Sequence, residues 1–174
     1  MNYHLRNICR IRKFVNQDTC HTVVRTLVTS RLDYCNSLYN GVSDKSLSLL
    51  QKLQNKAART IYRKPKRTHT SPLIKDLHWL PVKQRVHFKS LTLTYKCLHK
   101  QAPTYLSNLL SYRQSSYKTR SSSQPTLNIP RTHKAIGDRA FSRFAPKLWS
   151  QLPAAIMHSQ SVGSFKRSLK THLF

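Results

Sequence analysis

The 174-residue sequence contains no glutamate, and its acidic residues are five aspartates. These aspartates stand singly at positions 18, 33, 44, 76 and 138. General acid–base catalysis by paired carboxylates and two-metal catalysis both require at least two acidic side chains close together. No cysteine–histidine or serine–histidine pattern with an orienting acid compensates for this lack. The sequence therefore predicts no catalytic residue and no autonomous enzyme.

Glycine and long apolar runs are also scarce. Only three glycines are present, which argues against a glycine-rich phosphate-binding loop and against β-rich folds with many tight turns. The longest apolar stretches are only a few residues, so we expect no membrane span. The basic N-terminus has no apolar region after it and does not match a secretory signal.

The four cysteines form no C-x-x-C pair. We interpret them as reduced thiols of an intracellular protein, nuclear or cytoplasmic, with Cys20 and Cys35 as small core residues on apolar stripes. The only close Cys/His pairs are Cys20-His21 and Cys97-x-His99, and neither has the spacing of a structural zinc site. The sequence therefore predicts no metal site and no cofactor.

Positive charge is what the chain has in excess. There are 31 Lys and Arg residues against 5 acidic ones, which gives a formal net charge of +26. Such a charge opposes a compact free state and favours binding to a polyanion. Nucleic acid is the expected partner, and an anionic membrane surface is the alternative. Hydrophobic residues still make up 39% of the chain, so a core is possible.

Apolar residues recur at spacings of three and four in several segments, which predicts a mainly α-helical fold of six to eight helices. We expect helices at about residues 4–15, 18–40, 44–61, 72–77, 82–99, 103–110, 138–152 and 161–173. Gly41 is expected to stop the second of these helices, and Asp138 is expected to cap the seventh, which Pro146 should break. Thr126–Arg131 is the only plausible strand.

The composition changes along the chain suggest three parts. Residues 1–110 should form a helical bundle, and residues 126–174 a smaller C-terminal helical segment. Residues 111–125 are rich in Ser and Tyr, carry three positive charges and lack apolar periodicity, which is typical of a linker.

Three groups of residues are candidates for nucleic-acid contact. They are a basic stretch at the end of the third helix, a linker in which tyrosines alternate with cations, and three cations spaced four residues apart near the C-terminus. The candidates are Arg59, Arg63, Lys64, Lys66, Arg67, Tyr112, Arg113, Tyr117, Lys118, Arg120, Arg139, Arg143 and Lys147. The basic stretch has a simpler interpretation as a solvated helix end, where cations suit the helix dipole. For Trp79 and Trp149 we favour core anchoring over base stacking, and for Asp33 an ion pair or a hydrogen bond between helices.

A collinear series of motifs resembles the C-terminal region of non-LTR (LINE-type) retrotransposon reverse transcriptases, in particular the jockey and chicken-repeat lineages. The series covers nearly the whole chain: Ser30–Tyr39, Leu53–Arg59, Leu77–Val82, Tyr95–His99, Ala102–Leu106, Gly137–Phe141, Ala145–Trp149, Leu152-Pro153 and Ser164–Phe174. The resemblance implies a place after the polymerase palm, in thumb-like helices and the segment beyond them. The polymerase motif Tyr-x-Asp-Asp is absent. Met1 falls inside the matching region, so the resemblance also implies a truncated reading frame.

The expected function is therefore that of a non-catalytic fragment of an RNA-directed DNA polymerase. Its partners would be RNA or an RNA–DNA hybrid, bound without sequence specificity, and the polymerase core of the parent element. The alternative is a protein-interaction fragment that packs on a missing polymerase core and has no autonomous function. Exposure of Val23, Val24, Leu27 and Val28 would favour that alternative. Nothing in the sequence indicates an oligomeric state.

Overall fold

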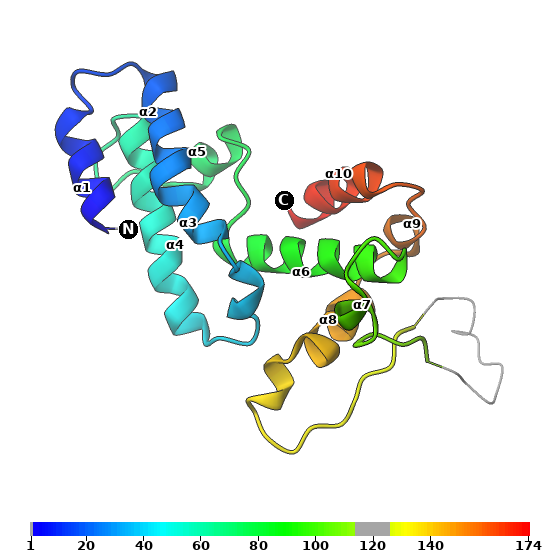
Figure 1. Cartoon of the computed structure of the whole chain (residues 1–174). Coiled ribbons are helices and arrows are strands. Elements are labelled where there is room, and N and C mark those ends of the chain that lie inside the picture. The colour runs from blue at the N-terminus through cyan, green and yellow to red at the C-terminus, as the bar shows by residue number, and fades with distance from the viewer. Residues whose placement is uncertain (1, 114–125) are drawn as a thin grey trace. The chain divides into compact units, whose positions relative to one another are not determined.

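The computed structural model describes residues 2–113 and 126–174. These residues form a mainly α-helical fold, as the apolar spacing predicts (Figure 1). Within the described ranges there is no strand, and the segment expected as a strand contributes only an isolated bridge between Tyr112 and Leu127. The chain forms two compact units. The N-terminal unit is Met1–Asn36 with Val42–Arg85, and the C-terminal unit is Ser37–Gly41 with Val86–Phe174. The division after Arg85 lies inside the bundle that the sequence analysis extends to residue 110.

The N-terminal unit is built from helices that pack around one core. The elements are α1 (Asn2–Ile11), α2 (Gln17–Val24), a π-helical turn (Arg25–Thr29), α3 (Ser30–Asp33), α4 (Asp44–Ile61), α5 (Ser71–Asp76) and the start of α6 (Val82–Leu98). Helices α1, α2 and α4 lie side by side (Figure 1). The buried core residues are Leu5, Ile8, Cys20, Val24, Val28, Leu32, Leu53, Ala57, Ala58, Ile61, Ile74 and Trp79.

The second expected helix ends earlier than Gly41. The helical backbone stops at Asp33, and Cys35 takes a positive φ of 47° before a 3-10 turn at Asn36–Tyr39. Cys35 is exposed, so its interpretation as a core residue is wrong, whereas Cys20 is buried. Burial raises the pKa of the Cys20 thiol, which fits an unreactive core position. The apolar spacing continues past Asp33 and therefore overestimates the length of the helix.

Helix α4 begins as expected but buries one more polar residue than its pattern suggests. Ser43 caps the helix by accepting a hydrogen bond from the Ser46 amide at 3.3 Å. Gln54, which the apolar stripe places on the polar face, is only 1% exposed. Its Nε2 atom donates to the Leu80 carbonyl at 2.9 Å, and the neighbouring Gln51 Oε1 accepts from the Val82 amide at 2.8 Å. Both amides satisfy the backbone at the start of α6, which accounts for the burial of Gln54.

The C-terminal unit has a core rich in aromatic rings. Its elements are most of α6, α7 (Thr104–Ser107), a 3-10 turn (Gly137–Arg139), α8 (Phe141–Trp149), α9 (Ala154–Met157) and α10 (Val162–Leu173). Phe165 stacks on Tyr95 with ring centroids 4.3 Å apart and on Trp149 at 5.9 Å. The Tyr95 hydroxyl donates to the Ser159 carbonyl at 2.5 Å. Trp149 is buried in this core and Trp79 in the core of the N-terminal unit, which confirms the anchoring role expected for both.

Helix α8 corrects two expectations. It continues through Pro146, because the lost amide leaves only one backbone carbonyl without its helical partner and the ring is fully buried in the core. Asp138 does not cap α8, since Ala140 holds the N-cap position. Asp138 instead accepts a hydrogen bond from the Thr132 hydroxyl at 2.6 Å and forms an ion pair with Arg143. The Thr132 hydrogen bond is the main cause that lowers the pKa of Asp138, with the positive charge of Arg143 adding to it.

In the described ranges, four non-glycine residues occupy left-handed backbone conformations, each two residues after the end of a helix. They are Cys35, Arg63, His78 and Lys100, with φ between 47° and 55°. A glycine commonly takes this place because an L side chain is strained there. With only three glycines in the sequence, the helix ends carry that strain instead.

Replacing Lys100 by glycine should therefore stabilise the protein by about 1 kcal/mol. Lys100 is exposed, has a φ of 55°, and its amide donates to the Cys97 carbonyl at 3.3 Å, a bond that glycine retains. Urea unfolding of the full chain measures the change. Lys89→Gly, at an exposed position within α6, is the matched control and should destabilise by about 1 kcal/mol. Equal signs for the two variants would contradict this interpretation.

Candidate nucleic-acid interface

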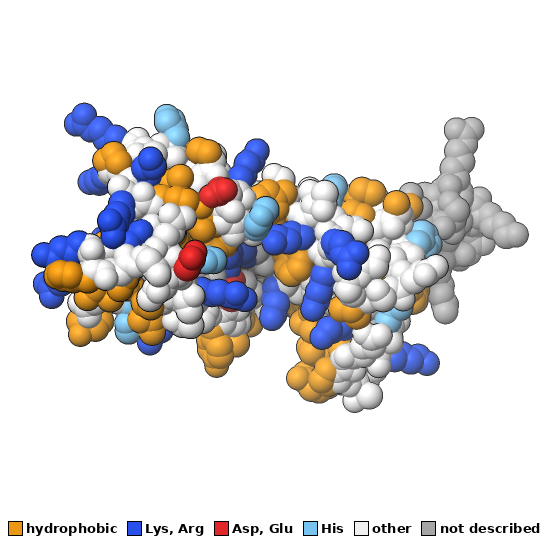
Figure 2. All heavy atoms as spheres, turned by 90° about the horizontal axis from the view of Figure 1, so that it is seen from above, with side chains coloured by type: hydrophobic (Ala, Val, Ile, Leu, Met, Phe, Trp, Pro, Cys, Tyr) orange, Lys and Arg blue, Asp and Glu red, His pale blue; other side chains and the backbone are white. Residues whose placement is uncertain are grey.

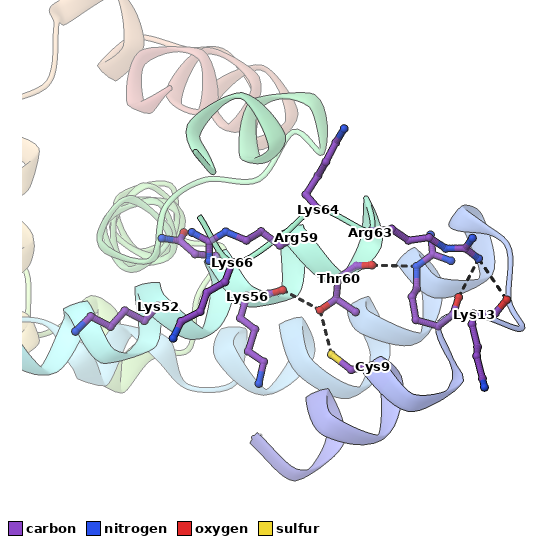
Figure 3. Close-up of a pocket in the computed structure, with 11 residues that line it drawn as sticks. Cys9, Lys13, Lys52, Lys56, Arg59, Thr60, Arg63, Lys64 and Lys66 are labelled. Atoms are coloured by element: carbon purple, nitrogen blue, oxygen red, sulfur yellow. Dashed lines mark hydrogen bonds between the residues drawn. The ribbon is translucent and has the colours of Figure 1, made fainter. Parts of the chain in front are cut away.

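A hollow of about 850 Å³ lies in the N-terminal unit between α1, the C-terminal half of α4 and the loop that follows α4 (Figure 3). Its volume is within the range of small-ligand pockets. We call it the basic groove. Its lining residues are Cys9, Arg12, Lys13, Lys52, Asn55, Lys56, Arg59, Thr60, Arg63, Lys64 and Lys66.

Eight of these eleven lining residues are Lys or Arg, and none is acidic. The α4 members recur at spacings of three and four, from Lys52 to Arg59, so they share one face of the helix. Like charges this close repel one another in the free protein. A groove with this composition is suited to anions.

Arg12 closes one end of the groove and joins its two walls. The side chain is 8% exposed, and its guanidinium donates three hydrogen bonds to backbone carbonyls. The acceptors are Thr60 at 2.9 Å, Ile61 at 2.6 Å and Val15 at 2.7 Å. The first two are carbonyls of the last turn of α4, which have no partner within the helix. Arg12 therefore caps α4 from a segment 48 residues away.

Arg63 caps in the opposite direction. Its Nη2 atom donates to the Arg12 carbonyl at 3.0 Å and to the Val15 carbonyl at 3.2 Å, just beyond the end of α1. Arg12, which follows α1, thus satisfies carbonyls at the end of α4. Arg63, which follows α4, satisfies carbonyls just beyond the end of α1. Arg63 therefore has the structural role expected of a cation at a helix end, where positive charge is favourable to the helix dipole.

The Arg59 guanidinium is held by one of its nitrogen atoms, and its other two nitrogen atoms are available to a ligand. Its Nε donates to the Thr68 carbonyl at 3.0 Å, which orients the guanidinium. Among the described residues, its two terminal amino groups have no hydrogen-bond partner. A guanidinium held in this way presents a planar pair of donors that matches two oxygens of one phosphate.

Three lysines of the groove differ from its arginines because their charged groups have no partner in the described ranges. The ammonium groups of Lys52, Lys56 and Lys66 form no hydrogen bond or ion pair with any residue in the described part of the chain. In Figure 3 their side chains extend to the same side of α4, whereas Lys64 points away from them. Their ammonium groups are available to a ligand.

The structure places four of the five basic-stretch candidates in the groove, namely Arg59, Arg63, Lys64 and Lys66, but not Arg67. In the C-terminal unit, Tyr112 is 54% exposed and Arg113 is exposed beside it. Tyr117, Lys118 and Arg120 lie outside the described residues.

Arg139, Arg143 and Lys147, the three cations spaced four residues apart, do not lie on one continuous helix. Arg139 precedes α8 and packs over Gly41, so close that a Cβ atom at position 41 would lie 2.7 Å from the Arg139 Cγ. Arg143 is held by Asp138 and donates to the Pro130 carbonyl at 2.5 Å. Arg139 and Lys147 are both exposed, and neither side chain forms a hydrogen bond or ion pair with the described residues. The 3-10 turn before α8 breaks the helical register on which the expectation depended.

Arg12, Lys13, Lys52 and Lys56 line the groove but are not among the residues predicted from the sequence. For the two α4 lysines a signal was present, since positions 52, 56, 59 and 63 share a helix face with the basic stretch. For Arg12 no local signal exists, because its burial depends on the packing of α1 against α4. Asp33 does form the expected ion pair, with Arg85 at 2.5 Å.

No other chemistry is apparent in the described ranges. They contain no group of three His, Cys or Asp side chains that could hold a metal ion. None of their helices is both long and apolar enough to cross a membrane. Figure 2 shows Lys and Arg side chains widely distributed over one face, with few acidic ones among them. No protein-family model matches the chain, and no curated protein or solved structure matches it.

Proposed function

We propose that the chain binds RNA or RNA–DNA hybrid without sequence specificity, through the basic groove. The observation that carries this proposal is the gathering of eight cationic side chains around one hollow without a single carboxylate. Phosphate contacts by Lys and Arg supply most of non-specific nucleic-acid affinity. The resemblance to the post-palm region of LINE-type reverse transcriptases supports the same interpretation, in which the fragment grips template or hybrid while the parent polymerase copies it.

Binding to single-stranded RNAs of unrelated sequence tests the proposal directly. Because phosphate contacts carry no sequence information, we expect similar affinities for all of them and a strong decrease with salt. Filter binding between low and physiological salt measures both. Affinities that differ widely between sequences, or that do not depend on salt, would contradict the proposal.

Stacking on Tyr112 would add affinity that salt does not screen. Replacing Tyr112 by Ala should cost about 1–3 kcal/mol of binding free energy if one base stacks there, with an unchanged salt dependence. Tyr105→Ala is the matched control, since Tyr105 is a similarly exposed tyrosine of the same unit without neighbouring cations in sequence. Equal effects of the two substitutions would remove Tyr112 from the interface.

Catalysis is not part of the proposed function. Because the sequence has no Glu and no adjacent Asp pair, we expect no primer extension on a homopolymer template with Mg²⁺ or Mn²⁺. Extension above that of a heat-inactivated sample would contradict this expectation.

A second candidate is the interaction fragment that packs on the polymerase core of a parent element. Exposed apolar residues of the N-terminal unit favour it, namely Leu27, Tyr34 and Leu49, with Tyr34 78% exposed. Against it, Val24 and Val28 are buried in the chain's own core rather than left for a partner. Replacing Tyr34 and Leu49 by serine should abolish association with the parent polymerase core while RNA binding is unchanged, if this candidate applies.

A further inference from the structure

The basic groove offers almost nothing that could recognise a base. No aromatic side chain lines it, and its uncharged members are Cys9, Asn55 and Thr60. The Thr60 hydroxyl donates to the Lys56 carbonyl at 2.9 Å, and the Asn55 Oδ1 accepts from Gln51 at 2.8 Å. The polar atoms left for a ligand therefore belong almost entirely to cations.

We propose that the groove binds a linear chain of phosphate groups through its charges alone, so that inorganic polyphosphate is a ligand of the same site. This inference rests on the proposed function, since it states which part of a nucleic acid the groove holds. No covalent bond forms or breaks. Ammonium and guanidinium N–H groups donate to phosphate oxygens, and counterions are released from the chain.

The dimensions of the cationic face match several consecutive phosphates. Lys52, Lys56 and Arg59 lie on successive turns of α4. The seven helical steps from Lys52 to Arg59 span about 10 Å. Nucleic-acid phosphates recur at about 3.4 Å along the axis of one strand, so this face accommodates about three of them.

The arginines give the groove a fixed geometry, so that it is more than a patch of surface charge. Arg12 and Arg63 hold the ends of α1 and α4 together through carbonyl hydrogen bonds, and Arg59 is oriented by Thr68. Ordering these side chains has already been accomplished by folding, so less conformational entropy is lost when an anion binds. The unpaired ammonium groups of Lys52, Lys56 and Lys66 then complete the contacts.

The test uses the full chain and three probes: fluorescent single-stranded RNA, medium-length inorganic polyphosphate, and an oligonucleotide of the same sequence with neutral methylphosphonate linkages. Direct binding and competition are measured for each at one salt concentration. We expect polyphosphate to bind and to displace the RNA completely, and the neutral oligonucleotide to do neither. The variant Lys52→Gln/Lys56→Gln/Lys66→Gln should lose affinity for polyphosphate and RNA by the same factor. A control with Lys75, Lys89 and Lys166 changed to Gln removes equal charge outside the groove and should lose far less.

The outcomes separate this inference from the proposed function. If RNA binds but polyphosphate neither binds nor competes, the inference is wrong and nucleic-acid binding stands. If polyphosphate binds but RNA does not, the proposed function fails while the groove remains a polyphosphate site. Equal losses in the groove variant and the control variant would overturn the inference, since binding would then follow net charge alone. Displacement by the neutral oligonucleotide would overturn it as well.

Discussion

Replacing Lys52, Lys56 and Lys66 together by glutamine is expected to weaken binding of single-stranded RNA by up to about 100-fold at 0.1 M salt. Each of these lysines lines the basic groove and has no partner in the described part of the chain, so its removal takes away a bond to phosphate without disturbing the protein itself. The factor follows from counterion release, because each phosphate of a single strand that is no longer neutralised lowers log K by about 0.7 for a tenfold decrease in salt from 1 M to 0.1 M. Fluorescence anisotropy with labelled RNA measures the decrease in affinity.

The control for this prediction must remove the same charge, because the protein carries +26 and attracts any polyanion. Lys75, Lys89 and Lys166 are exposed and lie outside the groove, which makes them suitable. Exposed charges that do not line the binding site are screened by salt, so their replacement should have a smaller effect. Circular dichroism of both variants establishes that the helices are retained.

Replacing Arg12 by alanine is expected to destabilise the protein by about 3 kcal/mol. The substitution removes three hydrogen bonds from a buried cation. It leaves the Ile61 carbonyl without its donor, whereas the carbonyls of Thr60 and Val15 each keep a hydrogen bond from Arg63. Urea unfolding of the full chain, followed by circular dichroism, measures the change in the free energy of unfolding.

Two further variants show that geometry rather than charge is responsible. Arg12→Lys keeps the charge but replaces a planar fork by a single ammonium group, so most of the destabilisation should remain. Arg10→Ala removes an exposed cation from the last turn of α1, two residues before Arg12, and should change stability by less than about 0.5 kcal/mol. A stability of Arg12→Ala equal to that of Arg10→Ala would contradict the capping role assigned to Arg12.

The fold was largely predictable from the sequence because apolar spacing and capping residues, which are local features, indicate where most of its helices lie. The serines at positions 43 and 161 precede periodic apolar segments, and both cap the helices α4 and α10 as that pattern indicates. The errors arose where tertiary contacts decide the outcome. Helical spacing continues beyond Asp33, but the chain turns there through the positive φ of Cys35. Pro146 remains inside α8 because its ring is buried.

The candidate site was predictable only in part, for a related reason. A run of cations such as residues 59–67 can be recognised in the sequence. A groove also needs a second wall, which the sequence does not show. The second wall is α1, and its contribution through Arg12 depends on hydrogen bonds to residues 48 and 49 positions away. The hydrogen bonds of Arg63 show that it has a structural role as well as a charge, which the sequence alone did not distinguish.

The salt dependence of RNA binding tests the central claim most directly. For the unchanged protein and for the Lys52, Lys56 and Lys66 variant, the logarithm of the association constant is plotted against the logarithm of the salt concentration. Leaving three phosphates of a single strand without their cations should make the slope shallower by about 2, while the control at Lys75, Lys89 and Lys166 should keep the slope of the unchanged protein. A variant slope equal to that of the unchanged protein would show that the groove does not hold the phosphates of RNA.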